Sequence, residues 1–246
     1  MAKHIKNLEE IFGRNIEMQV TGGFCRKIGS SLMRDANQIN DSYTIILSTY
    51  DEEDDDKDVV VAFMNLNIVV FDSLEEAWDL ADAEGEDEAS STEYAIRYIY
   101  DAKNDGRNGY IEINDFYVAC DLKNLYISPK FRGKGVSKAI TLLIPEIVHE
   151  VGYGAAVITT YLNPFAKQVE LTEDMQFDPN EFGGYSLEDG TLDPEIIKNA
   201  SKSLKDCGFA DYGDNHFVTD TVELRKIGIQ NGFDYTRSLK AIEYDY

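Results

Sequence analysis

Two stretches in the first third of the chain have the residue pattern of β-strands. Residues 43–50 and 58–71 are rich in β-branched and aromatic residues, which favour extended structure. Between them, residues 51–58 are almost all acidic, and a block of like charges repels itself and stays in water. The pattern predicts a two-stranded hairpin with a solvated acidic loop.

Two acidic helices are expected after this hairpin, followed by a return to strand. Ser73 is a candidate N-cap for the first helix, and Ser91 or Thr92 for the second. Residues 110–127 have strand character, broken near Asp121, where a turn fits.

The clearest helical period follows a glycine-rich loop. From Val136 to Val151, apolar residues recur at the three- and four-residue spacing of a helix with one buried face, and Pro145 is expected to bend that helix. Residues 155–161 form a short apolar strand of the kind buried in parallel sheets. Strand, glycine loop, helix and strand together make a parallel βαβ unit.

The C-terminal part is predicted to hold one more helix and two short strands. The helix extends from about Pro194 to Lys205, and Gly208 is a suitable C-terminal cap. Strand-like segments follow near residues 209–212 and 216–222.

The length of 246 residues and the hydrophobic content of 43% suffice for one sizeable core. Residues 1–42 show no clear period and are assigned to an N-terminal lobe packed on a main domain of residues 43–246. Within that domain, residues 163–193 hold prolines and glycines among acids, which indicates an inserted loop.

The formal net charge of -23 changes the expected partners. Because phosphate binding needs an electropositive surface, we expect neither a nucleic-acid partner nor an anionic membrane partner, and a cationic or amine-bearing partner fits better. An equally simple interpretation is that the acids only keep the protein dispersed.

The cysteines and histidines indicate the compartment and argue against a metal centre. The 3 cysteines are far apart and form no C-x-x-C pair, so we expect a reducing compartment, and with only 3 histidines we expect no metal. No stretch approaches the roughly 20 apolar residues of a membrane span, and a cytoplasmic location is predicted.

Residues 130–138 concentrate four cations around two glycines in an otherwise acidic protein. Glycines let a backbone come close to a ligand, and the following helix presents unpaired N–H groups at its N-terminus. Both features suit a phosphate or pyrophosphate, although a plain turn with solvated lysines remains the alternative. The G-x-x-x-x-G-K-[S/T] loop of nucleotide-triphosphate sites is absent.

The same loop resembles the acetyl-CoA-binding motif Q/R-x-x-G-x-G/A of the GNAT superfamily of N-acetyltransferases. Arg132 and Gly135 match that motif, whereas Ser137 stands where glycine or alanine is commoner. The segment from Ala200 to Phe209 resembles the superfamily's A-x-x-x-Y-x-x-x-G-F element, and the resemblance covers roughly residues 110–220. It implies an α+β fold with a mixed, mostly antiparallel sheet, flanking helices and a parallel βαβ unit at the acetyl-CoA site.

The resemblance implies an acetyl-CoA-dependent N-acetyltransferase that acts on a primary amine of a small molecule or protein without a metal. The pantetheine arm would pair like an added strand with Leu125, Tyr126 and Ile127, and the Ile127 N–H would steady the oxyanion. Asn163 matches a residue that contacts pantetheine in the superfamily. The pyrophosphate would lie on the loop that holds Arg132, Gly133, Lys134, Gly135, Val136 and Ser137.

The chain departs from the superfamily in its proton-transfer groups. Asp121 is the candidate general base, at a position where some members carry glutamate. Leu204 occupies the place of the tyrosine that protonates the departing thiolate, so Tyr161, Tyr185 or Tyr212 substitutes for it, or no acid is used.

These departures leave a second function open, a CoA-binding interaction module without catalysis. Two acidic residues, Glu112 and Asp115, line either the acceptor site or a solvated strand edge. Residues 101–112 approach a calcium-loop pattern, but Lys103 at a ligand position argues against it. We assign His149, near the C-terminal end of its predicted helix, a structural role.

Overall fold

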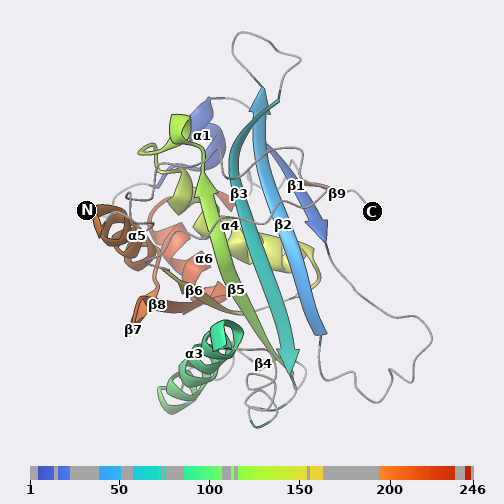
Figure 1. Ribbon diagram of the computed structural model, residues 1–246, viewed down its shortest axis with the longest axis vertical. Helices are drawn as coiled ribbons and strands as arrows, with labels where there is room; N and C mark the ends of the chain where they lie inside the picture. The colour runs from blue at the N-terminus through green and yellow to red at the C-terminus, as the bar shows by residue number, and fades with distance from the viewer. Residues whose placement is uncertain are drawn as a thin grey trace, which may run out of the picture.

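A nine-stranded mixed sheet runs through the described part of the computed structural model (Figure 1). The structure describes residues 5–13, 16–22, 39–50, 58–71, 73, 75, 86–106, 112–113, 116–153, 156–162, 194–235 and 242–244. The strand order is β7-β8-β6-β5-β3-β2-β1-β9, and β4 pairs with β5 off this path. The strands are β1 (Glu17–Gly22), β2 (Ile39–Tyr50), β3 (Asp58–Phe71), β4 (Glu112–Ile113), β5 (Phe116–Ile127), β6 (Val157–Tyr161), β7 (Ala210–Gly213), β8 (His216–Asp220) and β9 (Ile242–Tyr244).

Most neighbouring strands are antiparallel, and the parallel pairs are β5 with β6 and β1 with β9. The β5–β6 pair is joined through helix α4 (Val136–Glu150), as expected of a parallel βαβ unit. The predicted fold class, an α+β arrangement of helices around a mixed, mostly antiparallel sheet with a parallel βαβ unit, is therefore confirmed.

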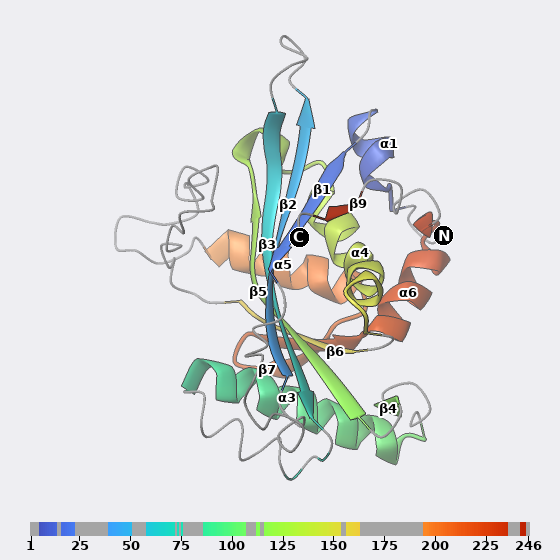
Figure 2. The ribbon, with the colours of Figure 1, turned by 90° about the vertical axis from the view of Figure 1, so that its right-hand side faces the viewer.

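Helices cover both faces of the sheet. Along β5, Val118 and Cys120 point into the core that contains α4, whereas Tyr117 and Ala119 point into the core that contains α3. We call these two surfaces the α4 face and the α3 face. In Figure 2, α1, α4 and α6 lie on one side of β1–β3, and α3 crosses the lower end of the sheet. The helices are α1 (Leu8–Phe12), α3 (Glu86–Asn104), α5 (Pro194–Asp206) and α6 (Thr221–Gln230), with a short 3-10 helix η2 (Pro129–Phe131).

Helix α4 is the central helix of its layer. Every residue from Ala139 to Val148 is buried, including Pro145 and Glu146. The carboxylate of Glu146 is paired with the guanidinium of Arg225 on α6, which compensates an otherwise costly buried charge. This packing holds the start of α4, where the glycine loop ends, in a fixed place.

The predicted hairpin is present as β2 and β3, which pair antiparallel with Tyr50 opposite Asp58. Tyr43, Ile45 and Leu47 are buried, and the residues between them are half-buried, as the alternating pattern requires. The acidic loop at residues 51–57 lies outside the described residues.

The predicted break near Asp121 is wrong, because β5 passes through this residue as continuous strand. The irregularity lies two residues later: Leu122 pairs with Leu66 and Asn124 with Asn65, so Lys123 is an extra residue in a β-bulge. A bulge reverses the alternation of side chains, which allows Leu122 and Leu125 to face the same core.

The predicted start of the second acidic helix is also wrong. Helix α3 begins at Glu86, so Ser91 and Thr92 are buried inside it and are not its N-caps. The acids at 86–88 favour the earlier start because negative charge near a helix N-terminus complements its dipole. Of the first predicted helix, only Ser73 and Glu75 are described.

Residues of the predicted N-terminal lobe contribute to the main core. β1 pairs with β2, and Leu8, Ile16 and Met18 are buried in the core of the α4 face. The division at residue 42 stays a prediction, and the predicted insertion at 163–193 lies outside the described residues.

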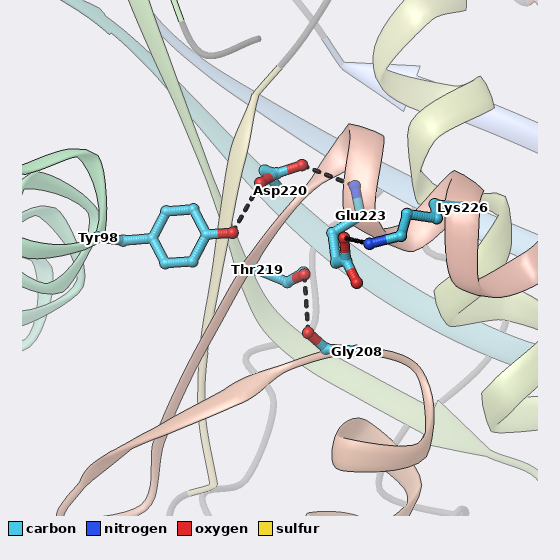
Figure 3. Close-up of polar contacts among 6 residues, drawn as sticks. All are labelled: Tyr98, Gly208, Thr219, Asp220, Glu223 and Lys226. Carbon is cyan, nitrogen blue, oxygen red and sulfur yellow. Dashed lines mark hydrogen bonds and ion pairs between the residues drawn. The ribbon is translucent and has the colours of Figure 1, made fainter. Parts of the chain in front are cut away.

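Strand β8 ends at Asp220, two residues before the predicted end, because Asp220 caps the unpredicted helix α6. Its Oδ1 accepts the Glu223 N–H at 2.7 Å, and its Oδ2 accepts the Tyr98 hydroxyl at 2.6 Å (Figure 3). Thr219 Oγ1 donates to the Gly208 carbonyl at 3.1 Å. Asp220 thus joins α3 to α6 through the sheet.

Candidate functional site

β5 and β6 separate in the middle of the sheet. They pair only from Ala119 with Val157 to Leu122 with Thr160, where Thr160 Oγ1 also donates to the Leu122 carbonyl at 2.9 Å. Beyond this point β5 stays with β3 as far as Ile127, and β6 stays with β8. We call this separation the fork.

The backbone of β5 beyond the bulge presents alternate peptide groups to the fork. Ser128 N–H donates to the Val61 carbonyl of β3 at 3.0 Å, whereas the Ile127 carbonyl accepts Arg132 Nε at 2.9 Å. Since successive residues of a strand direct their N–H and C=O groups to opposite edges, those of Leu125 and Ile127 point toward the fork. This edge has the geometry that a ligand adding as a strand requires.

The glycine loop follows β5 directly and ends at the first turn of α4. Gly133 and Gly135 have φ values of 74° and 90°, in the left-handed region that favours glycine, and Gly135 is the N-cap of α4. A Cβ atom on either would meet nothing within 4 Å, so close packing of the protein does not explain these glycines. The first N–H groups of α4, at Val136 and Ser137, have no acceptor within the helix and suit an anion.

The cations of the loop are held by local contacts. Lys130 Nζ and Lys134 Nζ lie 5.8 and 5.4 Å from the centroid of the Phe131 ring. Phe131 is buried and meets Phe12 of α1 edge-on at 5.2 Å, which anchors the loop to the core. Lys138 is paired with Asp206 of α5 and is therefore less available to a ligand than Lys134.

Asp121, the candidate base, lies next to the point where the fork begins. It is opposite Thr159 in β6, and Thr159 Oγ1 approaches Asp121 Oδ1 at 3.3 Å. Both side chains belong to the α3 face, as do Tyr117 and Ala119 on the same strand. A group that enters the fork from the α3 face thus passes this carboxylate.

Leu204, which the resemblance predicted to replace a proton-donating tyrosine, is buried in the core of the α4 face. Of the phenols that could replace it, Tyr212 donates to Asp101 Oδ2 at 2.9 Å on the far side of β8. Tyr161 ends β6 one residue beyond the last β5–β6 pair, and it is 37% exposed. Of these two tyrosines, Tyr161 is therefore the one beside the fork.

His216, which the sequence analysis did not single out, completes an aromatic stack with Tyr161. The His216 ring lies 4.6 Å from Tyr161 and 4.1 Å from Tyr94 of α3, with interplanar angles of 22° and 23°. Burial lowers the pKa of His216, and the backbone at Gly213 and Asp214 with the nearby carboxylates of Asp214 and Glu93 opposes this in part. No sequence pattern marks this histidine, because strand pairing alone brings it to Tyr161.

Several predicted residues cannot be placed. Asn163, Asp115 and Tyr185 lie outside the described residues, and only the backbone of Glu112 is described, paired with Tyr117. Asp101 and Lys103, from the segment that approaches a calcium loop, lie in the last turn of α3, and the described residues contain no cluster of three metal-ligating side chains.

An open groove of about 400 Å³ between α4 and α6 lies far from the glycine loop. It includes Pro145 and His149 from the C-terminal half of α4, so it is not part of the fork. No helix in the described ranges is long and apolar enough to cross a membrane.

No family model matches the chain, and no curated protein matches it. Among solved structures, the KacTA–DNA complex is similar with 11% identity and a TM-score of 0.36, covering 88% of this chain and 99% of that one. The structure of AtaTR bound with AcCoA has 11% identity and a TM-score of 0.32, covering 86% and 98%. A tyrosine-to-phenylalanine mutant of KacT has 11% identity and a TM-score of 0.33, covering 86% and 99%. These similarities are too distant to transfer an activity, a substrate or a partner to this chain.

Proposed function

We propose that this protein is an acetyl-CoA-dependent N-acetyltransferase that acetylates a primary amine. The observation that carries the proposal is the fork, which opens beside the segment of β5 that leads into the glycine loop and the N-terminus of α4. The strand edge would hold the pantetheine arm of CoA, and the anion site that follows it would hold the pyrophosphate. These two parts of CoA are joined in the same order.

The backbone would supply most of the binding. Leu125 and Ile127 would pair with the amide groups of pantetheine, and the loop from Gly133 to Ser137 would hold the pyrophosphate, assisted by Lys134. Arg132 would contribute by orienting the end of β5 through its bond to the Ile127 carbonyl.

The nitrogen of an ammonium substrate loses two protons in the reaction, and the departing thiolate gains one. The amine nitrogen bonds to the thioester carbonyl carbon, the carbon–sulfur bond breaks, and the thiolate leaves with the electron pair. Asp121 would accept the first proton, from the ammonium group, directly or through one water. The nitrogen would release its second proton to solvent after the attack, and the thiolate would take a proton from Tyr161 or solvent. Because Ile127 lies six residues from Asp121 on β5, roughly 18 Å of strand, the Leu125 N–H, which points into the fork nearer to Asp121, would donate to the developing oxyanion.

One observation favours the second candidate, a CoA-binding module that catalyses nothing. Leu204 is buried and has no proton to donate at the position of the superfamily's acid. The two candidates differ in a single result: mass spectrometry of amines incubated with labelled acetyl-CoA detects transfer only if the protein is an enzyme.

Calorimetry with acetyl-CoA tests the site itself, with Gly135→Glu as the variant and Gly152→Glu as its matched control. Both glycines have positive φ, at 90° and 101°, stand at opposite ends of α4 and leave room for a Cβ. The strain is therefore similar, but only Gly135→Glu places a negative charge at the pyrophosphate, and we expect it to weaken binding roughly tenfold or more. Equal affinities in the two variants would show that the site is wrongly placed. Binding should survive metal chelators.

A further inference from the structure

Polar side chains gather on the α3 face of the sheet around the fork. The residues are Asn65 on β3, Asp121 on β5, Thr159 and Tyr161 on β6, and His216 on β8; we call them the polar belt. Thr159 and Tyr161 are two residues apart on one strand and so project from the same face, and Asp121 is diagonal to Tyr161 across the fork. Diagonal side chains of this kind lie within reach of one small ligand.

The aromatic stack leaves one face of Tyr161 directed toward the fork. Because Tyr94 and Tyr161 are both nearly parallel to the His216 ring and at stacking distance, they must lie on its opposite faces. Tyr161 therefore has His216 on the β8 side, and its other ring face looks toward β5. The exposed fraction of 37% for a side chain in the middle of the sheet order agrees with an open ring face.

The polar belt also contains buried polar atoms that no described group satisfies. Asn65 Oδ1 has no hydrogen-bond partner in the described part of the chain. The ring nitrogens of His216 also lack a well-aligned partner there, although the backbone at Gly213 and Asp214 lies close by. Leaving a buried acceptor without a hydrogen bond destabilises a fold, so Asn65 Oδ1 is a candidate acceptor for a donor that a ligand supplies.

The groups around the fork suit a cationic donor. Asn65 Oδ1 and the Asp121 carboxylate are both acceptors, and an ammonium group has three N–H donors and no acceptor. The open face of the Tyr161 phenol ring attracts cations as well. An ammonium group would therefore meet complementary partners from three strands of the sheet.

We infer that the polar belt binds a charged ammonium group of the acceptor, and that the acceptor is an aliphatic amine with more than one ammonium group. One ammonium would lie on the open face of Tyr161, while a second nitrogen gives its proton to Asp121 and then reaches the thioester in the fork. The acetylation of that second nitrogen rests on the proposed function. The net charge of -23 favours the same class of ligand, because the field of the protein concentrates cations.

Calorimetry with spermidine on the full-length protein tests the inference, with Tyr161→Leu as the main variant. We expect spermidine affinity to fall on the order of 5- to 10-fold, because the substitution removes the aromatic ring face but leaves the negative charge of Asp121 in place. Tyr161→Phe keeps the ring face and should bind within about twofold of the wild type. Tyr100→Leu removes a tyrosine that is 48% exposed on α3 and controls for nonspecific attraction to the acidic surface.

Two results would overturn the inference: equal spermidine affinity in Tyr161→Leu and the wild type, or equally tight binding of the neutral 1,8-octanediol. If Tyr161→Leu does not fold, Asn65→Leu is the alternative variant in the polar belt, and it should also weaken spermidine binding. Acetyl-CoA affinity is measured on the same samples. If the wild type does not bind acetyl-CoA, the proposed function fails, whereas the spermidine series still decides whether the belt binds polyamines.

Discussion

Asp121 combines three properties that a general base at this site needs. It lies at the start of the fork, it faces the side from which the amine is inferred to enter, and its carboxylate is positioned by Thr159 at 3.3 Å. The sequence suggested Asp121 by its distance from Arg132 alone, and the strand geometry adds the reason why its side chain is suitably placed.

We predict that Asp121→Asn lowers kcat by roughly 10²-fold at neutral pH, because a positioned base contributes 10²–10⁴. Acetyl-CoA affinity should change little, since the carboxylate lies on the α3 face and the proposed CoA site is backbone. Activity should partly recover at high pH, where the free amine forms without help. A wild-type kcat across the pH range would exclude Asp121 as the base.

His216 should make the fold sensitive to mild acid. Because burial lowers its pKa from 6.5, the unfolded chain binds the proton more readily than the native state. Stability should therefore decline as pH falls below 6.5, and this contribution should level off below the lowered native pKa. His216→Phe preserves a flat ring between two phenols and should flatten the dependence, as read by urea unfolding at several pH values. If the free energy of unfolding of His216→Phe depends on pH as steeply as that of the wild type, the acid sensitivity comes from carboxylates and not from His216.

At the scale of the elements, the sequence predicted helices that have one buried face and strands in which β-branched and aromatic residues are concentrated. β3 was predicted at its observed bounds, and α4 and α5 to within one residue at each end. The departure of β5 from alternation was also visible, but it was assigned to a turn at Asp121. A turn and a bulge give similar local patterns, and pairing with β3 on both sides of Lys123 is what distinguishes them.

Elements that depend on distant partners were missed. β9 has three residues and pairs with β1 from the opposite end of the chain, so no local pattern marks it. Helix α6 had a local signal, Asp220 three residues before Glu223, which is the spacing of an N-cap with an acid in the first turn. An apolar run through Phe217 and Val218 concealed that signal by extending the expected strand.

The contacts of Asp220 predict a graded loss of stability. Tyr98→Phe should cost about 1 kcal/mol, the net value of one hydrogen bond. Asp220→Ala should cost about 2–4 kcal/mol, because it removes both the cap of α6 and the hydrogen bond that Asp220 accepts from the buried Tyr98 hydroxyl. Chemical denaturation measures both values. The double variant should lose less than the sum, and strict additivity would show that the two side chains are not coupled.

For the molecule as a whole, the charge of -23 should act on the rate at which an acceptor arrives. We predict that kcat/KM for a polyamine falls as ionic strength rises, because exposed charges are screened over about 8 Å at physiological salt. A neutral-pH assay with saturating acetyl-CoA isolates this effect from cofactor binding. If kcat/KM does not change with ionic strength, the acidic residues do not attract the acceptor and only keep the protein in solution.

The fork has a further consequence for the exchange of amide hydrogens with solvent. The Leu125 N–H points into the fork, whereas the Tyr126 N–H points toward β3. A ligand that pairs along this edge should slow deuterium uptake at Leu125 and leave Tyr126 unchanged, whereas a ligand held only by the glycine loop should slow neither. Protection of every second amide along one strand would therefore record both the place and the extended conformation of a bound pantetheine arm.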